Sequence, residues 1–166
     1  VVAMATVREV AETSWDLLHQ EIVDHFFAPE SGIAQPEKLV ERLGYDVGMK
    51  LSERSSKDKP RFSDDLDVIT FLCKDFWVEV FHKQVDKLRT NHKGVYELQD
   101  HKFRALMRVS AKDPSEVKAA AQRYLQFSCG MVRGALANLG ISAVVTAVTA
   151  TEAAQIPSCI FVVKVK

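Results

Sequence analysis

The spacing of hydrophobic residues changes along this chain, and that spacing predicts its elements. In the first third, apolar residues recur every three or four positions, which is typical of amphipathic helices. The first predicted helix runs from about Val7 to Phe27 and ends before Pro29. The second begins at Pro36, a residue that suits a first helical position. Its apolar stripe consists of Leu39, Leu43, Val47 and Leu51.

Two further helices are predicted from capping residues and apolar periodicity. The third is capped by Ser63, carries Asp64 and Asp65 in its first turn, and extends to about Leu88. Its apolar residues occupy several faces, which predicts a central helix covered on more than one side. The fourth begins at the pair 113–114, an aspartate and a proline, and Gly140 is expected to end it.

The strands are predicted where the apolar period falls to two. A hairpin is expected between the runs Gly94–Leu98 and Phe103–Val109, joined by a polar turn at residues 99–102. Two β-branched runs, Ile141–Thr151 and Cys159–Val165, close the sequence. This order favours an α+β domain with helices over one side of an antiparallel, four-stranded sheet. We expect one domain over residues 7–166, preceded by a disordered or added segment at 1–6.

Composition and charge exclude several classes of function. The 166 residues are 47% hydrophobic, which is enough for one self-sufficient core. Lysine plus arginine and aspartate plus glutamate number 22 each, so no broad positive field favours nucleic acid. The most hydrophobic stretch, residues 141–154, is shorter than a bilayer span and contains polar residues. The three cysteines form no C-x-x-C pair, which favours a reducing compartment.

Few residues suggest catalysis or metal binding. The five histidines include no two that lie four apart on a predicted helix, as paired zinc ligands usually do. Cys129 with His92 as its base is the remote case of a cysteine hydrolase, but a small buried residue is the favoured interpretation of Cys129. We therefore expect no catalytic residue, no cofactor and no metal.

Two glycine pairs and one arginine need a structural explanation. Gly44 with Gly48 and Gly130 with Gly134 each lie four apart on one helical face. Because mid-helix glycine costs about 1 kcal/mol relative to alanine, each pair indicates a close approach by a backbone or a ligand. Close helix packing is favoured over a ligand channel. Arg133, in a mostly apolar helix, is expected either to pair internally with a carboxylate or to meet a partner chain.

Three long segments carry a resemblance to a known family: Phe71–Asp100, Phe127–Ile141 and Glu41–Arg54. The first contains LRTNH-x-G-x-Y-x-LQD, a motif too long and too particular for chance similarity. Phe62, Asp67 and the last strand extend the match to nearly the whole chain. These segments resemble the small subunits of the TRAPP vesicle-tethering complex and, among them, the subunit-6 lineage.

The resemblance implies both a fold and a function. The fold would be a TRAPP-type α/β-plait, with about four main helices on a four-stranded antiparallel sheet. The function would be that of a non-catalytic scaffold subunit in ER-to-Golgi and Golgi vesicle transport, cytoplasmic and peripheral at the early Golgi and endoplasmic reticulum. It would form a heterodimer with the acyl-binding core TRAPP subunit through its first two helices. Its support of nucleotide exchange on a Rab GTPase would be indirect, and its membrane association would come only through the complex.

One position departs from the acyl-binding subunits that the resemblance brings in. Those subunits have a cysteine two residues before the phenylalanine that aligns with Phe62, and the cysteine accepts or contacts an acyl chain. This sequence has Pro60 at that place. A covalent lipid is therefore not expected here.

The first two predicted helices carry more apolar surface than two outer helices need if one side of each faces water. We expect the heterodimer to form on Trp15, Leu18, Ile22, Phe26, Leu39, Leu43 and Val47. Packing of these residues on the central helix is the alternative explanation. A competing function is a small-molecule binding module, because the TRAPP fold is similar to that of 4-vinyl-reductase-like sensor domains. A channel between helices would then hold a lipid or a tetrapyrrole.

Overall fold

The computed structural model describes residues 11–110, 113–149 and 157–166. The expected segment 1–6, the expected helix start at Val7 and the end of the strand expected to reach Thr151 lie outside these residues. The helical elements are α1 (Glu12–Phe27), η1 (Pro29–Ser31), α2 (Pro36–Ser56), α3 (Asp65–Phe71), the π-helical turn η2 (Leu72–Phe76), α4 (Trp77–Phe81), η3 (Arg104–Leu106) and α5 (Pro114–Asn138). The strands are β1 (Lys87–Thr90), β2 (Val95–Asp100), β3 (Ala143–Thr149) and β4 (Cys159–Val165).

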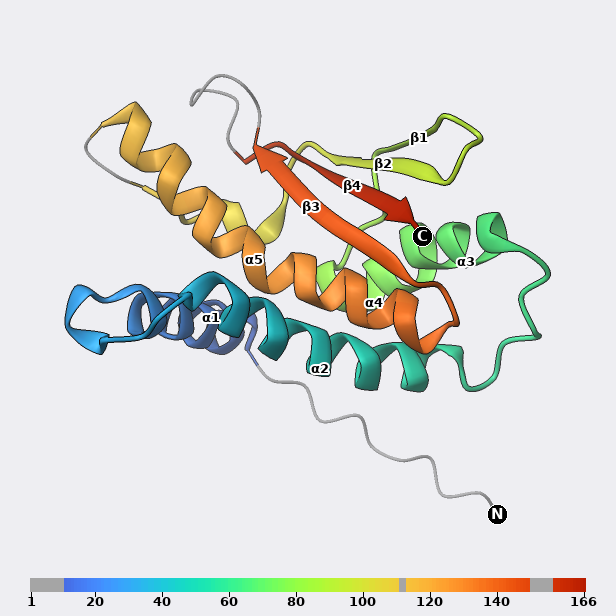
Figure 1. The fold of residues 1–166 in the computed structure, drawn as a ribbon, viewed down its shortest axis with the longest axis horizontal. Coiled ribbons are helices and arrows are strands. Elements are labelled where there is room, and N and C mark those ends of the chain that lie inside the picture. The colour runs from blue at the N-terminus through green and yellow to red at the C-terminus, as the bar shows by residue number, and fades with distance from the viewer. Residues whose placement is uncertain (1–10, 111–112, 150–156) are drawn as a thin grey trace, which may run out of the picture.

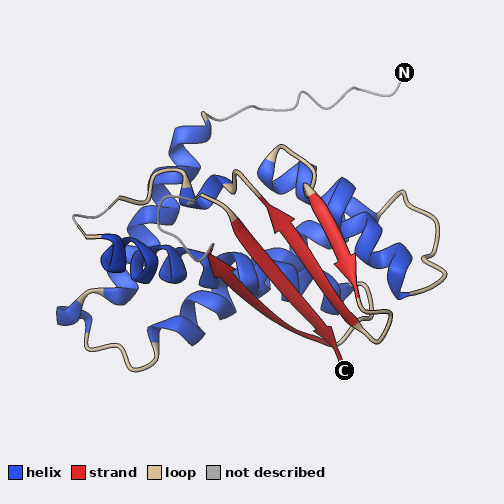
Figure 2. Cartoon of the chain, turned by 90° about the horizontal axis from the view of Figure 1, so that it is seen from above, coloured by secondary structure: helices blue, strands red, loops and turns tan. Residues whose placement is uncertain are grey.

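The elements form three layers, which Figure 1 shows with the sheet at the top. The strands are antiparallel in the order β1-β2-β4-β3. α5 lies beneath the sheet beside the segment from α3 to α4, and α1 with α2 forms the layer farthest from the strands. In Figure 2 the strands lie in front of the helices, so the described helices cover one face of the sheet. The predicted α+β architecture is confirmed.

The first hairpin joins β1 to β2. The prediction that β2 forms a hairpin with a following strand over residues 103–109 is wrong. Leu88 pairs with Leu98 across this hairpin, although the sequence placed Leu88 at the end of a helix. The turn is fixed locally, because the Asn91 side chain accepts hydrogen bonds from the amides of Lys93, at 2.8 Å, and Val95, at 3.1 Å. A side-chain hydrogen bond of this kind competes with helix and favours a turn.

Residues 103–109, predicted as a strand, instead contain η3. The side chains that face the core there are Phe103 and Leu106, which are both fully buried. They lie three residues apart, which is the period of a 3₁₀ turn and not of a strand. The alternation of apolar and basic residues in this segment was therefore a misleading signal.

The third helix is shorter than predicted and is interrupted by the π-helical turn. It ends at Phe81, where His82 adopts the left-handed conformation with φ of 59°, and not at Leu88. Its burial on several faces confirms the prediction of a central helix. The buried residues are Val68, Ile69, Phe71, Leu72, Cys73, Phe76, Trp77 and Phe81.

Two helix ends agree with the capping rules, one of them shifted by a residue, whereas the Asp113 side chain makes no capping hydrogen bond at the start of α5. Asp64, not Ser63, caps α3, because its carboxylate accepts a hydrogen bond from the Asp67 amide at 2.8 Å. The Asp67 carboxylate in turn accepts from the Ser63 amide at 3.1 Å. At the other end of the chain, Gly140 follows α5 with φ of 88°, which confirms it as the residue that ends this helix.

The two glycine pairs hold α2 and α5 together at close range. A Cβ added at Gly44 or Gly48 would overlap a main-chain carbonyl oxygen of α5, and one added at Gly130 or Gly134 would overlap a carbonyl oxygen of α2. Ser52 continues the contact, donating a hydrogen bond from its hydroxyl to the Ala135 carbonyl at 3.3 Å. Close helix packing is confirmed at these pairs, so backbone and not a ligand fills the line between the two helices, which we call the glycine seam.

Aromatic rings join the helical layer to the sheet. Trp77 and Phe81 of the third helix, Phe103 before η3 and Phe161 of β4 have ring centroids 4.7 to 6.0 Å apart. Three of the four are fully buried, and Phe81 is 8% exposed. Rings in this geometry contribute beyond the area they bury, so the cluster fixes how the helices sit on the strands.

Candidate functional site

α2 turns its small residues inward and its large apolar residues outward. The buried stripe of α2 consists of Val40, Gly44, Gly48 and Ser52. The apolar stripe found in the sequence is displaced from it by one residue, and there Leu39 is 44% exposed and Leu43 39% exposed. Val47 and Leu51, farther along the same stripe, are half-buried. Because Gly44 and Gly48 occupy the close contact with α5, Leu39 and Leu43 remain at the surface.

α1 also exposes apolar side chains while burying a narrow face. His19 and Val23 are buried, whereas Leu18, one position away from His19, is 53% exposed. Ile22 and Phe26 are half-buried. Leu17 is 57% exposed and was missed in the sequence, because it does not fall on the three-or-four spacing of the other apolar residues.

An ion pair and an aromatic cluster hold α1 in place. The Asp16 carboxylate lies 3.0 Å from the Arg104 guanidinium of η3 and 3.3 Å from that of Arg108. Beside it, Trp15 stacks on His19, with ring centroids 6.0 Å apart, and packs against Phe127 of α5 at 5.6 Å. These contacts position the amino-terminal half of α1 and keep Trp15 at the edge of the surface.

His19 lies inside this cluster in a neutral form. Its ring contacts Tyr124 at 5.5 Å and Phe127 at 5.3 Å between centroids. Its Nε2 atom is buried and has no hydrogen-bond partner among the described residues. Burial lowers the pKa of His19 to about 4, and the nearby Asp16 carboxylate opposes that shift only partly. A buried neutral imidazole is a structural residue whose protonation would destabilise α1.

The α1–α2 patch is our name for the seven candidate residues Trp15, Leu18, Ile22, Phe26, Leu39, Leu43 and Val47. Four of them, Trp15, Leu18, Leu39 and Leu43, are more than a third exposed, and the other three are half-buried. Phe26 and Val47 also pack against the core. Figure 1 shows α1 and α2 side by side in the outer layer, and they contact each other. The patch therefore brings large apolar side chains from two helices onto one layer of the molecule.

Cys129 and His92, the pair that the sequence offered for catalysis, lack the properties that catalysis needs. Burial, together with a smaller contribution from the Glu41 carboxylate, raises the pKa of the Cys129 thiol to about 12. His92, the proposed base, is exposed in the β1–β2 turn, whereas Cys129 lies in α5. No group of three or more histidine, cysteine or carboxylate side chains could hold a metal ion within the described parts of the chain. A thiol with a raised pKa is a poor nucleophile.

Arg133 pairs inside the protein, so the first of its two expected roles is confirmed. Its guanidinium lies 2.7 Å from the Glu41 carboxylate of α2. The same guanidinium lies 4.5 Å from the centroid of the Tyr45 ring. This ion pair and cation–π contact tie α5 to α2 across the glycine seam.

Comparison with known proteins identifies the family. The family model for "Transport protein particle (TRAPP) component" matches residues 15–166. The chain belongs to the TRAPP family. Trafficking protein particle complex subunit 6b of Danio rerio is 45% identical over 93% of this chain and 97% of that protein. Subunit 6B of Mus musculus is 46% identical over 90% and 94%, and subunit 6A of Bos taurus 40% identical over 92% and 95%. Within the TRAPP family, the chain is therefore of the subunit-6 lineage.

Solved structures confirm the TRAPP fold. Subunit 3 of the trafficking protein particle complex from Naegleria fowleri, covalently bound to palmitic acid, superposes with a TM-score of 0.75. It shares 14% identity, over 92% of this chain and 93% of the other. An H-NOX protein from S. oneidensis gives a TM-score of 0.54 at 11% identity, over 98% and 79%. Both likenesses concern the fold alone.

In this TRAPP chain, the position expected to differ from acyl-binding subunits is an exposed proline. Pro60 lies in the segment before α3 and has no nucleophilic atom. Two residues later, the Phe62 ring packs against Phe71 of α3, with centroids 5.2 Å apart. No described helix has both the length and the apolar composition to span a bilayer.

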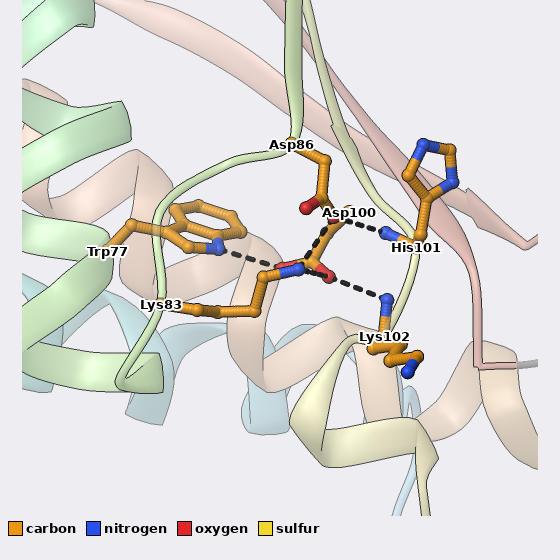
Figure 3. A network of polar contacts seen from close by, with 6 residues as sticks. All are labelled: Trp77, Lys83, Asp86, Asp100, His101 and Lys102. Atoms are coloured by element: carbon orange, nitrogen blue, oxygen red, sulfur yellow. Dashed lines mark hydrogen bonds and ion pairs between the residues drawn. The ribbon is translucent and has the colours of Figure 1, made fainter.

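A buried carboxylate lies at the end of β2, and Figure 3 shows its partners. This residue, Asp100, is fully buried. It accepts hydrogen bonds from the Trp77 indole at 3.0 Å, the Lys83 ammonium at 2.7 Å and the Lys102 amide at 3.0 Å. A buried charge with this many donors is compensated, so it fixes the loop after α4 against the end of β2.

The Lys83 ammonium forms ion pairs with two carboxylates, those of Asp100 and Asp86. Its ammonium also lies 2.6 Å from Asp86, whose carboxylate accepts from the His101 amide at 2.7 Å. Partial burial lowers the pKa of Lys83, but the hydrogen bonds to Asp100 and Asp86 outweigh it and raise that pKa above its ordinary value. For Asp86, partial burial acts to raise the pKa, yet the bonds from Lys83 and His101 leave the pKa lowered. Lys83 and Asp86 therefore remain ionised near neutral pH.

Proposed function

We propose that this chain is a non-catalytic scaffold subunit of the TRAPP complex, acting in ER-to-Golgi and Golgi vesicle transport. It forms a heterodimer with the acyl-binding core TRAPP subunit through the α1–α2 patch. It supports nucleotide exchange on a Rab GTPase indirectly, by helping to hold the complex together. It is cytoplasmic, and it is peripheral at the early Golgi and endoplasmic reticulum through the complex.

The observation that carries the proposal is that α2 buries glycines and exposes leucines, which is the reverse of an ordinary amphipathic helix. A helix that packs only within its own chain buries its large apolar side chains and exposes polar ones. α2 instead buries Gly44 and Gly48 and exposes Leu39 and Leu43. Contiguous exposed apolar residues of this kind mark a protein-interaction site. The partner is expected to cover the leucines and thereby remove them from water.

The likeness to subunit 3 supports a partner of the same fold. Two chains with the same architecture can associate through corresponding faces, which gives a nearly two-fold interface. Such an interface would place α1 and α2 of each subunit against those of the other. It would also leave the sheet of this chain, on the opposite side of the molecule, free for other contacts.

The test is co-expression of this chain with subunit 3 of the same organism, with native mass spectrometry and calorimetry of the purified product. The wild-type pair should form a stable one-to-one complex. Leu43→Asp should weaken that complex by about 100-fold or more, because the carboxylate would be desolvated in an apolar contact at a cost of about 3 kcal/mol. Val47→Asp should act in the same direction.

Val148→Asp is the matched control. Val148 is 49% exposed in β3, on the sheet face that the described helices leave uncovered. The substitution therefore introduces the same charge as Leu43→Asp, but away from the patch. Circular dichroism should show that Leu43→Asp and Val148→Asp are both folded. A complex that tolerates Leu43→Asp as well as it tolerates Val148→Asp would remove the α1–α2 patch as the interface.

A further inference from the structure

Two hollows meet at one end of the α1–α2 patch. The first, the apolar hollow, has a volume of about 320 Å³ and lies between α1, α2, α4, η3 and α5. The second, the basic hollow, has a volume of about 440 Å³ and lies between α1, η3 and the loop after α4. Arg104 and His82 line both, so the two hollows adjoin, and we call the pair the trough.

The apolar hollow is an extension of the α1–α2 patch. Trp15 and Val47, two residues of the patch, form part of its wall. Leu51, Val80 and the buried Met131 complete its apolar lining, and Glu79, His82 and Arg104 are its polar lining residues. A hollow with apolar walls from several helices matches the pockets in which interfaces hold their aromatic or aliphatic anchors. It would receive one large apolar side chain of whatever protein covers the patch.

The basic hollow combines charged and apolar residues. Lys83, Lys102, Arg104 and Arg108 line it together with the Asp16 carboxylate and the apolar side chains of Phe81 and Met107. Lys83 is held from behind by the Asp86 and Asp100 carboxylates. Figure 3 shows the Lys102 side chain turned away from Asp100, whose carboxylate it contacts only through its main-chain amide. Lys102 is exposed, so its ammonium is available to a group that enters the trough.

We propose that this trough binds a segment of the partner subunit that carries a large apolar side chain beside an acidic one. The apolar side chain occupies the apolar hollow, and the carboxylate lies against Lys102 and Arg108 in the basic hollow. An acidic residue is complementary in charge to the lysine and arginine side chains of the basic hollow. Because Trp15 and Val47 belong to both the apolar hollow and the α1–α2 patch, the segment comes from the partner that covers this patch. This inference rests on the proposed function and goes beyond it, because it assigns the partner a specific anchor.

A protein segment fits these features better than an anionic membrane. The apolar hollow is lined in part by Met131, which is buried at 2% exposure, so its floor lies below the molecular surface and a flat lipid surface cannot reach it. A chain segment can enter the trough, because side chains project from its backbone. Binding to anionic vesicles is the competing outcome of the test.

The experiment measures the dissociation constant of the complex with recombinant subunit 3 by calorimetry, at low and at high salt. Lys102→Glu should weaken binding about fivefold at low salt, because it replaces an attraction by a repulsion at the interface rim. The difference should vanish near 1 M salt, where the screening length is about 3 Å. Lys87→Glu, in the exposed edge strand β1, is the matched control and should bind like wild type at both salts.

Val80→Trp tests the apolar hollow independently, by filling it with a side chain of this chain itself. It should weaken binding about tenfold with no dependence on salt, and its thermal unfolding shows whether it is folded. If Val80→Trp does not fold, Lys102→Glu still decides the proposal. Vesicles of phosphatidylcholine with phosphatidylserine provide the second arm, and wild type and Lys102→Glu should both fail to bind them.

The outcomes separate the trough from the proposed function. If wild type binds subunit 3 and Leu43→Asp does not, but Lys102→Glu binds like wild type at low salt, the trough is wrong and the α1–α2 patch stands. Loss of vesicle binding in Lys102→Glu, with binding to subunit 3 unchanged, would overturn the protein segment in favour of a membrane. If wild type itself does not bind subunit 3, both proposals fall.

Discussion

Replacing Gly48 by alanine should destabilise the protein, although alanine is the better helix former. A Cβ at this position would lie 2.7 Å from the Met131 Cα and nearer still to the Met131 carbonyl oxygen. An ordinary contact begins at about 3.4 Å, so α2 and α5 must separate by at least 0.7 Å along the seam. Met131 main-chain atoms cannot rotate away as a side chain would.

The size of the effect follows from two opposing contributions. Overpacking a close contact costs about 1–3 kcal/mol, occasionally more, because neighbouring side chains lose their optimal contacts. Removing a mid-helix glycine returns about 1 kcal/mol of helix propensity. We take the upper part of the packing range, since the overlap is with backbone, and expect a net loss of about 2 kcal/mol. For a chain of this length, that loss lowers the melting temperature by about 4–8 °C.

The assay is urea unfolding followed by circular dichroism, with Glu53→Ala in the exposed side of α2 as the control for a substitution by alanine. Gly134→Ala should cost a similar amount, and the Gly48→Ala/Gly134→Ala double variant should cost less than the sum, because one separation of the helices relieves both overlaps. A Gly48→Ala variant that is about 1 kcal/mol more stable than wild type would refute the reasoning. It would mean that the two helices leave space between them, as a ligand channel requires.

Three other predictions concern buried groups. The pKa of His19 is about 4 in the folded protein and returns to its ordinary value of 6.5 on unfolding, so the unfolded chain binds more protons between these two pH values. The free energy of unfolding should therefore be full above pH 6.5 and fall by about 3 kcal/mol as the pH drops to 4. His19→Phe should remove that pH dependence in urea titrations. Lys83→Met should lower the free energy of unfolding by about 3 kcal/mol at pH 7 in the same measurement, because it leaves the Asp100 carboxylate buried without its cation. A loss below about 1 kcal/mol would show that the Trp77 indole and the main-chain donors alone compensate this carboxylate. Cys129 should resist iodoacetamide at about pH 8 in the native protein and react after unfolding, because burial raises the pKa of its thiol to about 12; rapid native labelling, read by mass spectrometry, would contradict this.

Long periodic segments were the part of the fold that the sequence predicted well. α2 begins at Pro36 as expected, and α5 ends before Gly140, because both signals act within one turn of the helix. β4 also has the predicted bounds, Cys159 to Val165, as a β-branched run of the right length. Local rules are sufficient where the neighbouring residues alone decide the backbone.

The first hairpin could not be predicted because non-local contacts select it. Leu88 continues the apolar period of the third helix, yet it pairs with Leu98 once His82 has ended that helix. Phe103 and Leu106 are buried from a 3₁₀ turn, and the Phe103 ring packs there between Phe81 and Phe161. A spacing of two or four residues does not contain that information.

The candidate site was predictable in part. The glycines at 44 and 48 and the leucine at 43 could each be found in the sequence, but which of the two neighbouring stripes faced inward could not. That choice depends on Gly130 and Gly134 lying opposite, which only the packing of α2 on α5 reveals. The trough was not predicted at all, because Val80, Lys102 and the rest of its lining come from segments far apart in the sequence.

Hydrogen–deuterium exchange of this chain, alone and with subunit 3 of the same organism, tests most directly the claim that another polypeptide covers the outer helices. The account predicts slower exchange in the complex across residues 15–26 and 39–47, with little change in β3 and β4. Unchanged exchange in both helices, with new protection confined to the sheet, would contradict it.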